Sequence, residues 1–144
     1  MIIKCIFNSV KNISMDYRCL NETDETDYSF LTIGSDFTVY GLMFFSNRVD
    51  YLICLDDNYP IWVPSNLFEV NTQELPNNWS LCITYLNSNY KILDDSFGIK
   101  SIISYHNLVN NISHYIGLLE RNPDDLKLFF LEKKKIDDQQ SFFY

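Results

Sequence analysis

One stretch of the sequence, Asp36–Val70, most constrains what this chain can fold into. It reads DFTVYGLMFFSNRVDYLICLDDNYPIWVPSNLFEV, in which runs of apolar and β-branched residues are separated by short polar turns. Because successive side chains of a strand point to opposite faces, these runs predict β-strands. We expect two long strands over residues 37–45 and 49–55, joined by a hairpin at residues 46–48.

Two prolines bound the segment after the second long strand. Residues 56–58, Asp-Asp-Asn, predict a turn, because Asp and Asn side chains hydrogen-bond nearby backbone groups. Ile61–Val63 then predicts a short strand between Pro60 and Pro64. Since proline cannot donate to a strand ladder, we expect these prolines to exclude long regular pairing.

Further strands are expected on either side of this stretch. Residues 2–7 predict a first strand, residues 80–85 a later one, and residues 90–93 a short edge strand. The polar connection over residues 8–28 carries four acidic residues within residues 22–27. Such a cluster predicts a solvated loop, and it also suits a basic partner.

Helices are expected in the last third of the chain. Asp94 can cap a helix start, and from Ile102 to Leu119 apolar residues recur at spacings of three and four, which predicts an amphipathic helix of about five turns. Asn122 followed by Pro123 predicts the start of a second helix, because Asn caps and Pro suits the first helical position. Residues 139–144 either dock in a groove or fray.

These elements predict an α+β fold, in which a small antiparallel, strongly bent β-barrel or sheet carries two C-terminal α-helices packed against it. Gly41 lies in the middle of the first long strand, where glycine allows the bend by which small barrels turn corners. The chain length fits a single domain over residues 1–144. Its expected parts are a β-barrel part at residues 1–93, a helical part at residues 94–135 and a tail at residues 136–144.

Charge and cysteine usage narrow the range of partners and compartments. The chain has 19 acidic and 11 basic residues, a net charge of −8, which repels nucleic acid and anionic membranes and complements a basic protein. The alternative is that this charge serves solubility alone. The sequence contains no apolar run of the roughly 20 residues that span a membrane, so we expect a cytoplasmic protein with reduced thiols. Its four cysteines lack zinc-ligand spacing and are expected to fill the core.

Reactive residues are not arranged for catalysis in the sequence. The adjacent carboxylates at residues 56–57 and 94–95 point to opposite faces of an extended chain, and turn and capping roles account for both pairs. His106 and His114 lie about 12 Å apart along a helix, too far to share a metal, and either is expected to be partly buried with its hydrogen bonds satisfied. We therefore expect no cofactor, no metal and no enzymatic activity.

Two resemblances bear on fold and function. The segment WVPSNLFEV resembles the closing signature of Src-homology-3-like barrels, in which a Pro-Ser-Asn element forms one turn of tight helix before the last strand. A resemblance to a family of small bacterial cytosolic proteins rests on KCIFNS at 4–9, LTIG at 31–34, TVYG at 38–41, YLICLDD at 51–57, YPIWVPSNLFEV at 59–70 and the Leu75–Trp79 spacing. Some members of that family are regarded as immunity proteins of polymorphic or contact-dependent toxin systems. The resemblance implies a Src-homology-3-like fold and carries over no catalytic residue.

The function expected from this resemblance is that of an immunity protein, which binds and neutralises a cognate, basic bacterial toxin domain. Electrostatic steering by acidic loops would be followed by burial of aromatic anchors. The alternatives are a protein-binding adaptor or regulatory module and a small-ligand-binding barrel or enzyme. The sequence leaves open the toxin's activity, the face that binds it, the mode of inhibition and the oligomeric state. The expected partner-binding residues are Glu22, Asp24, Glu25, Asp27, Asp56, Asp57, Tyr59, Trp62, Asp94 and Asp95.

Overall fold

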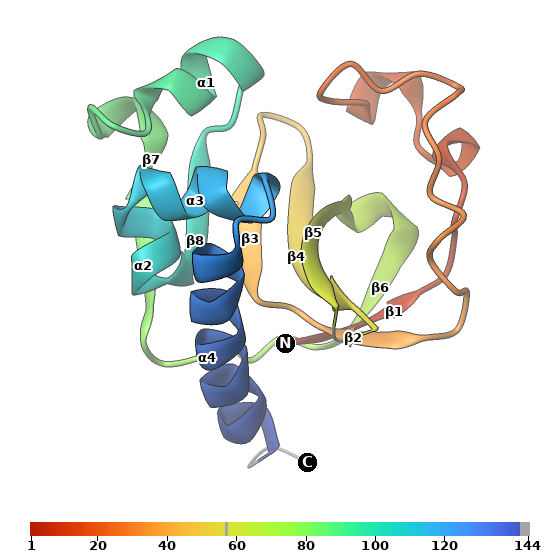
Figure 1. The fold of residues 1–144 in the computed structure, drawn as a ribbon. Coiled ribbons are helices and arrows are strands. Elements are labelled where there is room, and N and C mark those ends of the chain that lie inside the picture. Colours follow the sequence, from red (N-terminus) through yellow and green to blue (C-terminus); the bar gives the residue numbers. More distant parts are fainter. Residues whose placement is uncertain (57, 142–144) are drawn as a thin grey trace.

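The computed structural model describes residues 1–56 and 58–141, coloured along the chain in Figure 1. Its strands are β1 (Ile2–Cys5), β2 (Asp36–Thr38), β3 (Gly41–Phe44), β4 (Val49–Leu55), β5 (Tyr59–Pro64), β6 (Phe68–Thr72), β7 (Trp79–Ile83) and β8 (Ser101–Tyr105). The α-helices of the described residues are α1 (Lys91–Phe97), α2 (His106–Asn110), α3 (Ile112–Leu119) and α4 (Pro123–Gln140). Short 3₁₀ turns are η1 (Val10–Asn12), η2 (Met15–Tyr17), η3 (Ser65–Leu67) and η4 (Thr84–Leu86).

The strands form two open antiparallel sheets. One has three strands in the order β2-β1-β6, and the other has five in the order β5-β4-β3-β8-β7. The α+β class and the antiparallel sheets are therefore confirmed, whereas a closed barrel is wrong. The expected strand over residues 37–45 is divided into β2 and β3 at Val39 and Tyr40, immediately before Gly41, so one run of sequence serves both sheets.

The prolines beside residues 61–63 do not shorten the strand, contrary to the sequence expectation. Strand β5 includes Pro60 and Pro64, and it pairs with β4 along its whole length, from Tyr59 opposite Leu55 to Pro64 opposite Asp50. Strand β5 lies at the edge of its sheet, where a missing N–H on the outer side removes no ladder hydrogen bond. The expected tight turn after it is present as η3.

Two assignments in the last third of the chain are wrong. Residues 90–93, expected as an edge strand, belong to the start of α1, which contains Asp94 rather than beginning there. The expected helix from Ile102 is instead strand β8 followed by α2 and α3. Strand β8 lies between β3 and β7, and it is held by ladders on both sides. By contrast, the helix start at Asn122 and Pro123 is confirmed, and the Asn122 side chain accepts a hydrogen bond from the Asp124 backbone N–H.

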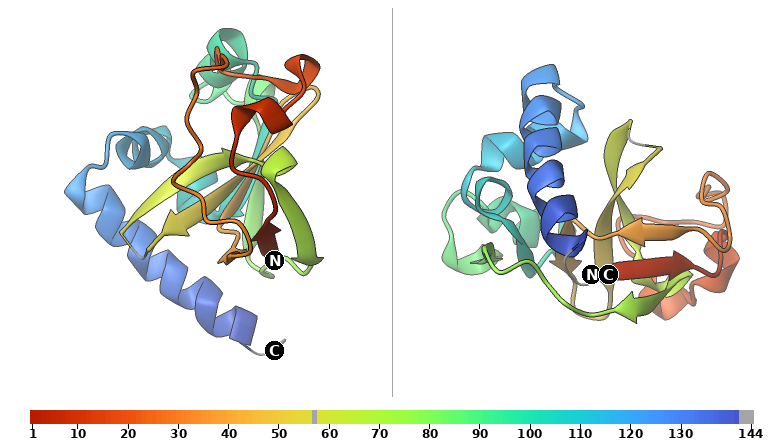
Figure 2. Two further views of the ribbon diagram at one scale, coloured as in Figure 1. Left: turned by 90° about the vertical axis from the view of Figure 1, so that its right-hand side faces the viewer. Right: turned by 90° about the horizontal axis from the view of Figure 1, so that it is seen from below.

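The helices and the small sheet cover opposite faces of the five-stranded sheet. Figure 1 and the view from below in Figure 2 show α2, α3 and α4 on one side and β1, β2 and β6 on the other. Two hydrophobic clusters follow this division: one joins Met43, Leu52 and Ile102 to helical residues such as Leu118 and Phe129, and the other gathers around Ile3. Cys5, Cys54 and Cys82 are buried, as expected of cysteines that fill the core, whereas Cys19 is only partly buried.

Candidate functional site

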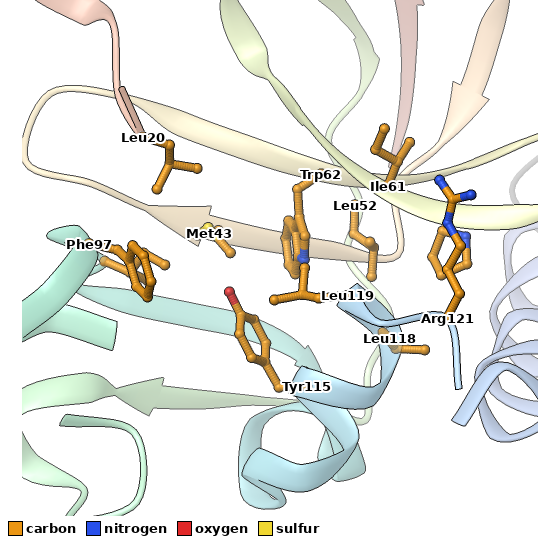
Figure 3. A pocket seen from close by; sticks show the side chains of 12 residues that line it. Leu20, Met43, Leu52, Ile61, Trp62, Phe97, Tyr115, Leu118, Leu119 and Arg121 are labelled. Atoms are coloured by element: carbon orange, nitrogen blue, oxygen red, sulfur yellow. The ribbon is translucent and has the colours of Figure 1, made fainter. Parts of the chain in front are cut away.

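A cavity of about 370 Å³ lies on the helical side of the five-stranded sheet, between β4, β5 and α3 (Figure 3). Its walls are almost entirely apolar, and they come from the N-terminal loop, from strands β3, β4 and β5, and from residues 97–121. At its rim, Leu20, Phe97 and Leu119 each expose about half of their surface. Protein cavities that hold small ligands begin at roughly 300 Å³ and have mostly apolar walls, so this is the candidate functional site. The lining residues are Leu20, Met43, Leu52, Pro60, Ile61, Trp62, Phe97, Ile99, Tyr115, Leu118, Leu119 and Arg121.

Trp62 forms one wall of the cavity because a glycine leaves room for its ring. Strand pairing places Gly41 opposite Leu52 and Leu52 opposite Trp62. A Cβ at Gly41 would lie 3.1 Å from Cη2 of Trp62 and 3.1 Å from Oγ of Ser104. The indole therefore crosses the sheet surface above the bare backbone of β3, and Gly41 serves this close approach as well as the bend beside it.

The loop that brings Leu20 to the rim is anchored by a buried ion-pair cluster. Arg48 donates from Nε to one oxygen of Asp50 at 2.7 Å, from Nη2 to the other oxygen at 3.1 Å, and from Nη1 to Glu22. Glu22 also accepts hydrogen bonds from the Cys19 backbone N–H at 2.9 Å and from the Tyr28 hydroxyl. A planar guanidinium suits this bidentate geometry, and the cluster ties the N-terminal loop to the β3–β4 turn.

The charges of this cluster depend on one another. Burial raises the pKa of Asp50, and Arg48 opposes that rise. Burial also disfavours the charge on Arg48, but the hydrogen bonds from Arg48 to Asp50 and Glu22 outweigh this effect and raise its pKa. Arg48 is therefore a permanent cation that balances buried carboxylates, and it has a structural role in holding the rim.

The expected partner-binding residues fall into two groups at opposite ends of the molecule. The first group contains the loop at residues 22–27 and the α1 pair Asp94 and Asp95, which lie at the upper end of Figure 1. Both segments meet the β3–β4 turn, because Glu22 binds Arg48 and the Lys100 side chain pairs with Asp94 while its N–H donates to the Phe44 carbonyl. Leu20 and Phe97 lie between them at the cavity rim.

Asp56 lies at the opposite end of the molecule from these two acidic segments. It follows β4, which has seven residues and so places Asp56 about 20 Å from the β3–β4 turn. Asp57 lies outside the described residues. Tyr59 is partly buried, and the guanidinium of Arg121 stacks on its ring at 3.9 Å. Trp62 is partly buried, packs against the main hydrophobic cluster and also lines the cavity.

Not all of the expected acidic residues present free charge at the surface. Glu22 exposes only 5% of its side chain in the pair with Arg48. Asp24 pairs with Arg18 at 2.9 Å, and Asp94 pairs with Lys100 at 2.7 Å. The expected carboxylates that are exposed and have no ion pair to another described residue are Glu25, Asp27, Asp56 and Asp95. Hydrogen bonds from Ser29 lower the pKa of Asp27, which keeps that group ionised.

His114 lies in a buried hydrogen-bonded chain outside the cavity. Its Nε2 is 2.7 Å from the Tyr105 hydroxyl, and its Nδ1 is 2.8 Å from Oδ1 of Asp125. A neutral ring that donates from Nδ1 and accepts at Nε2 satisfies all three side chains. The expectation of a histidine with satisfied hydrogen bonds is confirmed for His114, whereas His106 is exposed on α2.

Sequence reasoning missed most of the residues that shape this site. Arg48, Leu20, Leu119, Tyr115 and Arg121 attracted no functional expectation, since they come from three separate parts of the chain and no short motif joins them. The one available signal was Arg48 followed two residues later by Asp50, which places both side chains on one face of a strand.

Comparisons with protein-family models, curated proteins and solved structures find no significant match to this chain. Over residues 1–56 and 58–141, no group of three or more His, Cys, Asp or Glu side chains is placed to hold a metal ion. None of the helices in the described part of the chain combines the length and the apolar character needed to cross a bilayer.

Proposed function

We propose that this protein is an immunity-type inhibitor, which binds a cognate basic toxin domain and blocks its activity. The proposal rests on one observation. Two acidic segments that are far apart in the sequence lie on either side of an apolar rim formed by Leu20 and Phe97. The segments are the loop at residues 22–27 and the α1 pair Asp94 and Asp95. Exposed apolar anchors surrounded by charge are typical of tight protein interfaces.

The electrostatics of this end support a basic partner. Glu25, Asp27 and Asp95 are exposed and lack ion pairs within the described chain, so their field is available to an approaching protein. The whole chain adds to that field with its net charge of −8. Complementary charge raises association rates well above the neutral value of about 10⁵–10⁶ M⁻¹s⁻¹, which suits an inhibitor that must capture a toxin quickly.

The resemblance to Src-homology-3-like proteins forms part of the same proposal, supported by η3 at Ser65–Leu67 directly before β6. A cytoplasmic location is proposed with it, because a toxin that acts inside the cell must be met there. An adaptor for a regulatory partner is the competing function, since it would use the same rim without a toxin.

Co-expression with the product of the adjacent gene tests the proposal. Growth should stop when that product is expressed alone and resume when this protein is present, and the two proteins should co-purify less as the salt concentration rises. A variant with Leu20→Asp and Phe97→Asp, folded by circular dichroism, should fail to rescue. Absence of toxicity from the neighbour, or full rescue by that variant, would contradict the proposal.

A further inference from the structure

The polar side-chain groups that line the cavity are hydrogen-bond donors. They are the Tyr115 hydroxyl, the Trp62 indole N–H and the Arg121 guanidinium, and the remaining lining side chains are apolar. No carboxylate or amide side chain of a described residue is among them. A cavity with this lining favours a ligand that brings acceptors or negative charge on an apolar body.

Tyr115 offers its hydroxyl to the cavity interior. The residue is 4% exposed, and Figure 3 shows its hydroxyl pointing into the cavity on the side where Phe97 and Met43 lie. That hydroxyl forms no hydrogen bond with any residue that the structure describes. Burial raises the pKa of Tyr115, so the phenol stays protonated and can donate. A ligand oxygen that accepts from this hydroxyl would add a directed hydrogen bond inside a cavity with mostly apolar walls.

Arg121 provides a cation at the other end of the cavity. Figure 3 shows it beside Ile61, on the far side of Trp62 from Phe97. Its guanidinium stacks on the Tyr59 ring at 3.9 Å, and it forms no ion pair with another described residue, although the chain has 19 acidic side chains. An arginine held by stacking keeps its planar set of donors available for a carboxylate.

The backbone is strained at two of the lining residues. Leu20 has φ = 54° and Arg121 has φ = 56°, in the left-handed region that residues with a Cβ rarely adopt. Arg121 takes this conformation where α3 ends, with the Asn122 N–H donating to the Gly117 carbonyl and the Arg121 N–H to the Leu118 carbonyl. Leu20 takes it in the turn that the Glu22 N–H closes by donating to the Cys19 carbonyl. The positions of both residues at the cavity are therefore fixed by local backbone hydrogen bonds.

We propose that this cavity binds a small amphipathic carboxylate, whose apolar body lies along Trp62, whose carboxylate binds Arg121, and whose far end carries an oxygen that accepts from Tyr115. The inference goes beyond the proposed function, because it concerns a small molecule that binds inside the cavity when no protein partner is bound.

Matched aliphatic ligands test the carboxylate. Octanoate and octanol share a chain length and differ in charge, and binding is followed by amide shifts of the cavity residues in NMR spectra. We expect octanoate to bind at least ten-fold more tightly than octanol, and Arg121→Gln to remove this preference while leaving octanol binding unchanged. Lys127→Gln, which removes an exposed cation from α4 away from the cavity, should leave both affinities unchanged.

A series of ω-hydroxy acids of increasing chain length tests the second contact. One member should bind several-fold more tightly than its unsubstituted parent acid, and Tyr115→Phe should abolish that gain without weakening the parent. The inference is overturned if octanoate and octanol bind equally, if Arg121→Gln keeps the preference, or if no hydroxylated acid gains affinity through Tyr115. Saturation of the amide shifts at cavity residues alone would support it, whereas shifts spread over the surface would overturn it.

Discussion

Nδ1 of His114 lies 2.8 Å from Oδ1 of Asp125, and this contact joins α3 to α4 across the turn between them. Gly117, one turn after His114 on α3, makes the approach possible. A Cβ at Gly117 would lie 1.8 Å from Oδ2 of Asp125, so any larger residue must displace that carboxylate. The close packing of α3 against α4 therefore depends on residue 117 being a glycine, which has no side chain.

Replacing Gly117 by alanine should destabilise the protein by about 1–3 kcal/mol, because the new methyl group pushes Asp125 away from His114. Urea denaturation of a double-mutant cycle measures the effect. In an Asp125→Ala background the clash with the carboxylate is gone, and only the Cβ of residue 125 remains, 3.0 Å from the new methyl group. Because alanine is also the better helix former, the added cost of Gly117→Ala should be clearly smaller in this background. Equal costs in the two backgrounds would show that the carboxylate is not the obstacle.

The buried cluster around Arg48 should be far more costly to break than an exposed pair on the same end of the molecule. Arg48→Met leaves Asp50 and Glu22 buried without their cation, and we expect a loss of about 3–5 kcal/mol. Lys100→Met removes the half-exposed partner of Asp94 and should cost less than about 1 kcal/mol.

Hydrogen exchange should locate the damage of Arg48→Met. Because Glu22 accepts from the Cys19 backbone N–H, amides in the loop around residues 18–28 should lose protection before those of β4. Uniform loss of protection, or equal destabilisation by the two substitutions, would contradict a local anchoring role.

Local signals were sufficient where the structure is locally determined. Asn122 caps α4 through a hydrogen bond from Asp124, two residues away, and no distant residue is needed for that contact. The turn at η3 likewise follows from a few consecutive residues. Such elements could be predicted from sequence because all the interacting groups lie within one turn.

The segment from Ile102, which was expected to be a helix, shows that the buried residues can be predicted correctly while the type of secondary structure is predicted wrongly. Ile102, Tyr105 and Val109 do share one hydrophobic cluster, as their spacing suggested. They reach it from a strand and a helix in succession, because β8 fills the gap between β3 and β7. Ile116 and Leu119, the later members of the same pattern, are exposed. Spacing alone could not reveal the neighbouring strands that decide this segment.

The candidate site could be predicted only in part for the same reason. Trp62 and the acidic segments stood out by residue type, but Glu22 looked like a solvated loop residue because Arg48, its partner, lies on a different element. Tyr115 and Arg121 join Trp62 only through the packing of α3 beside the sheet. Contacts between distant residues are fixed by the tertiary fold, and no short segment of sequence encodes them.

Alkaline pH should destabilise the fold from about pH 10 upwards. Burial is the largest cause that raises the pKa of six tyrosines above the ordinary value of 10.0, namely Tyr28, Tyr40, Tyr51, Tyr90, Tyr105 and Tyr115. Since the folded pKa values exceed the unfolded ones, this stabilisation is complete below pH 10 and is lost as the pH rises. Each tyrosine contributes up to about 1.4 kcal/mol per pH unit in that window.

Denaturant titrations at a series of pH values, followed by circular dichroism, check this expectation. Phenolate absorbance should appear together with unfolding rather than before it, because the buried rings ionise only when exposed. A denaturation midpoint that is constant from about pH 9 to about pH 11 would contradict the direction of these shifts.

Charge-reversal variants should separate two effects on the association rate, that of the acidic segments at the rim and that of the net charge of the chain. The variant Glu25→Lys with Asp95→Lys should slow association with a basic partner by roughly ten-fold or more at low salt, through lost steering. The variant Glu69→Lys with Glu74→Lys changes the net charge equally, but it lies on and after β6, away from the cavity rim. Stopped-flow rates over a range of salt concentrations measure both. Equal slowing by the two variants would assign the effect to net charge.

Gly41→Ala should close part of the cavity by moving Trp62. The new Cβ would lie 3.1 Å from Cη2 of Trp62, so the ring must shift by a few tenths of an ångström, and we expect a loss of about 1–3 kcal/mol. Trp62 emission in a Trp79→Phe background reports the movement, and octanoate affinity should fall. Trp62→Phe removes the crowded atom, so the combination of both substitutions should recover part of the lost stability. Unchanged emission and affinity in Gly41→Ala would show that the indole does not depend on the bare backbone of β3.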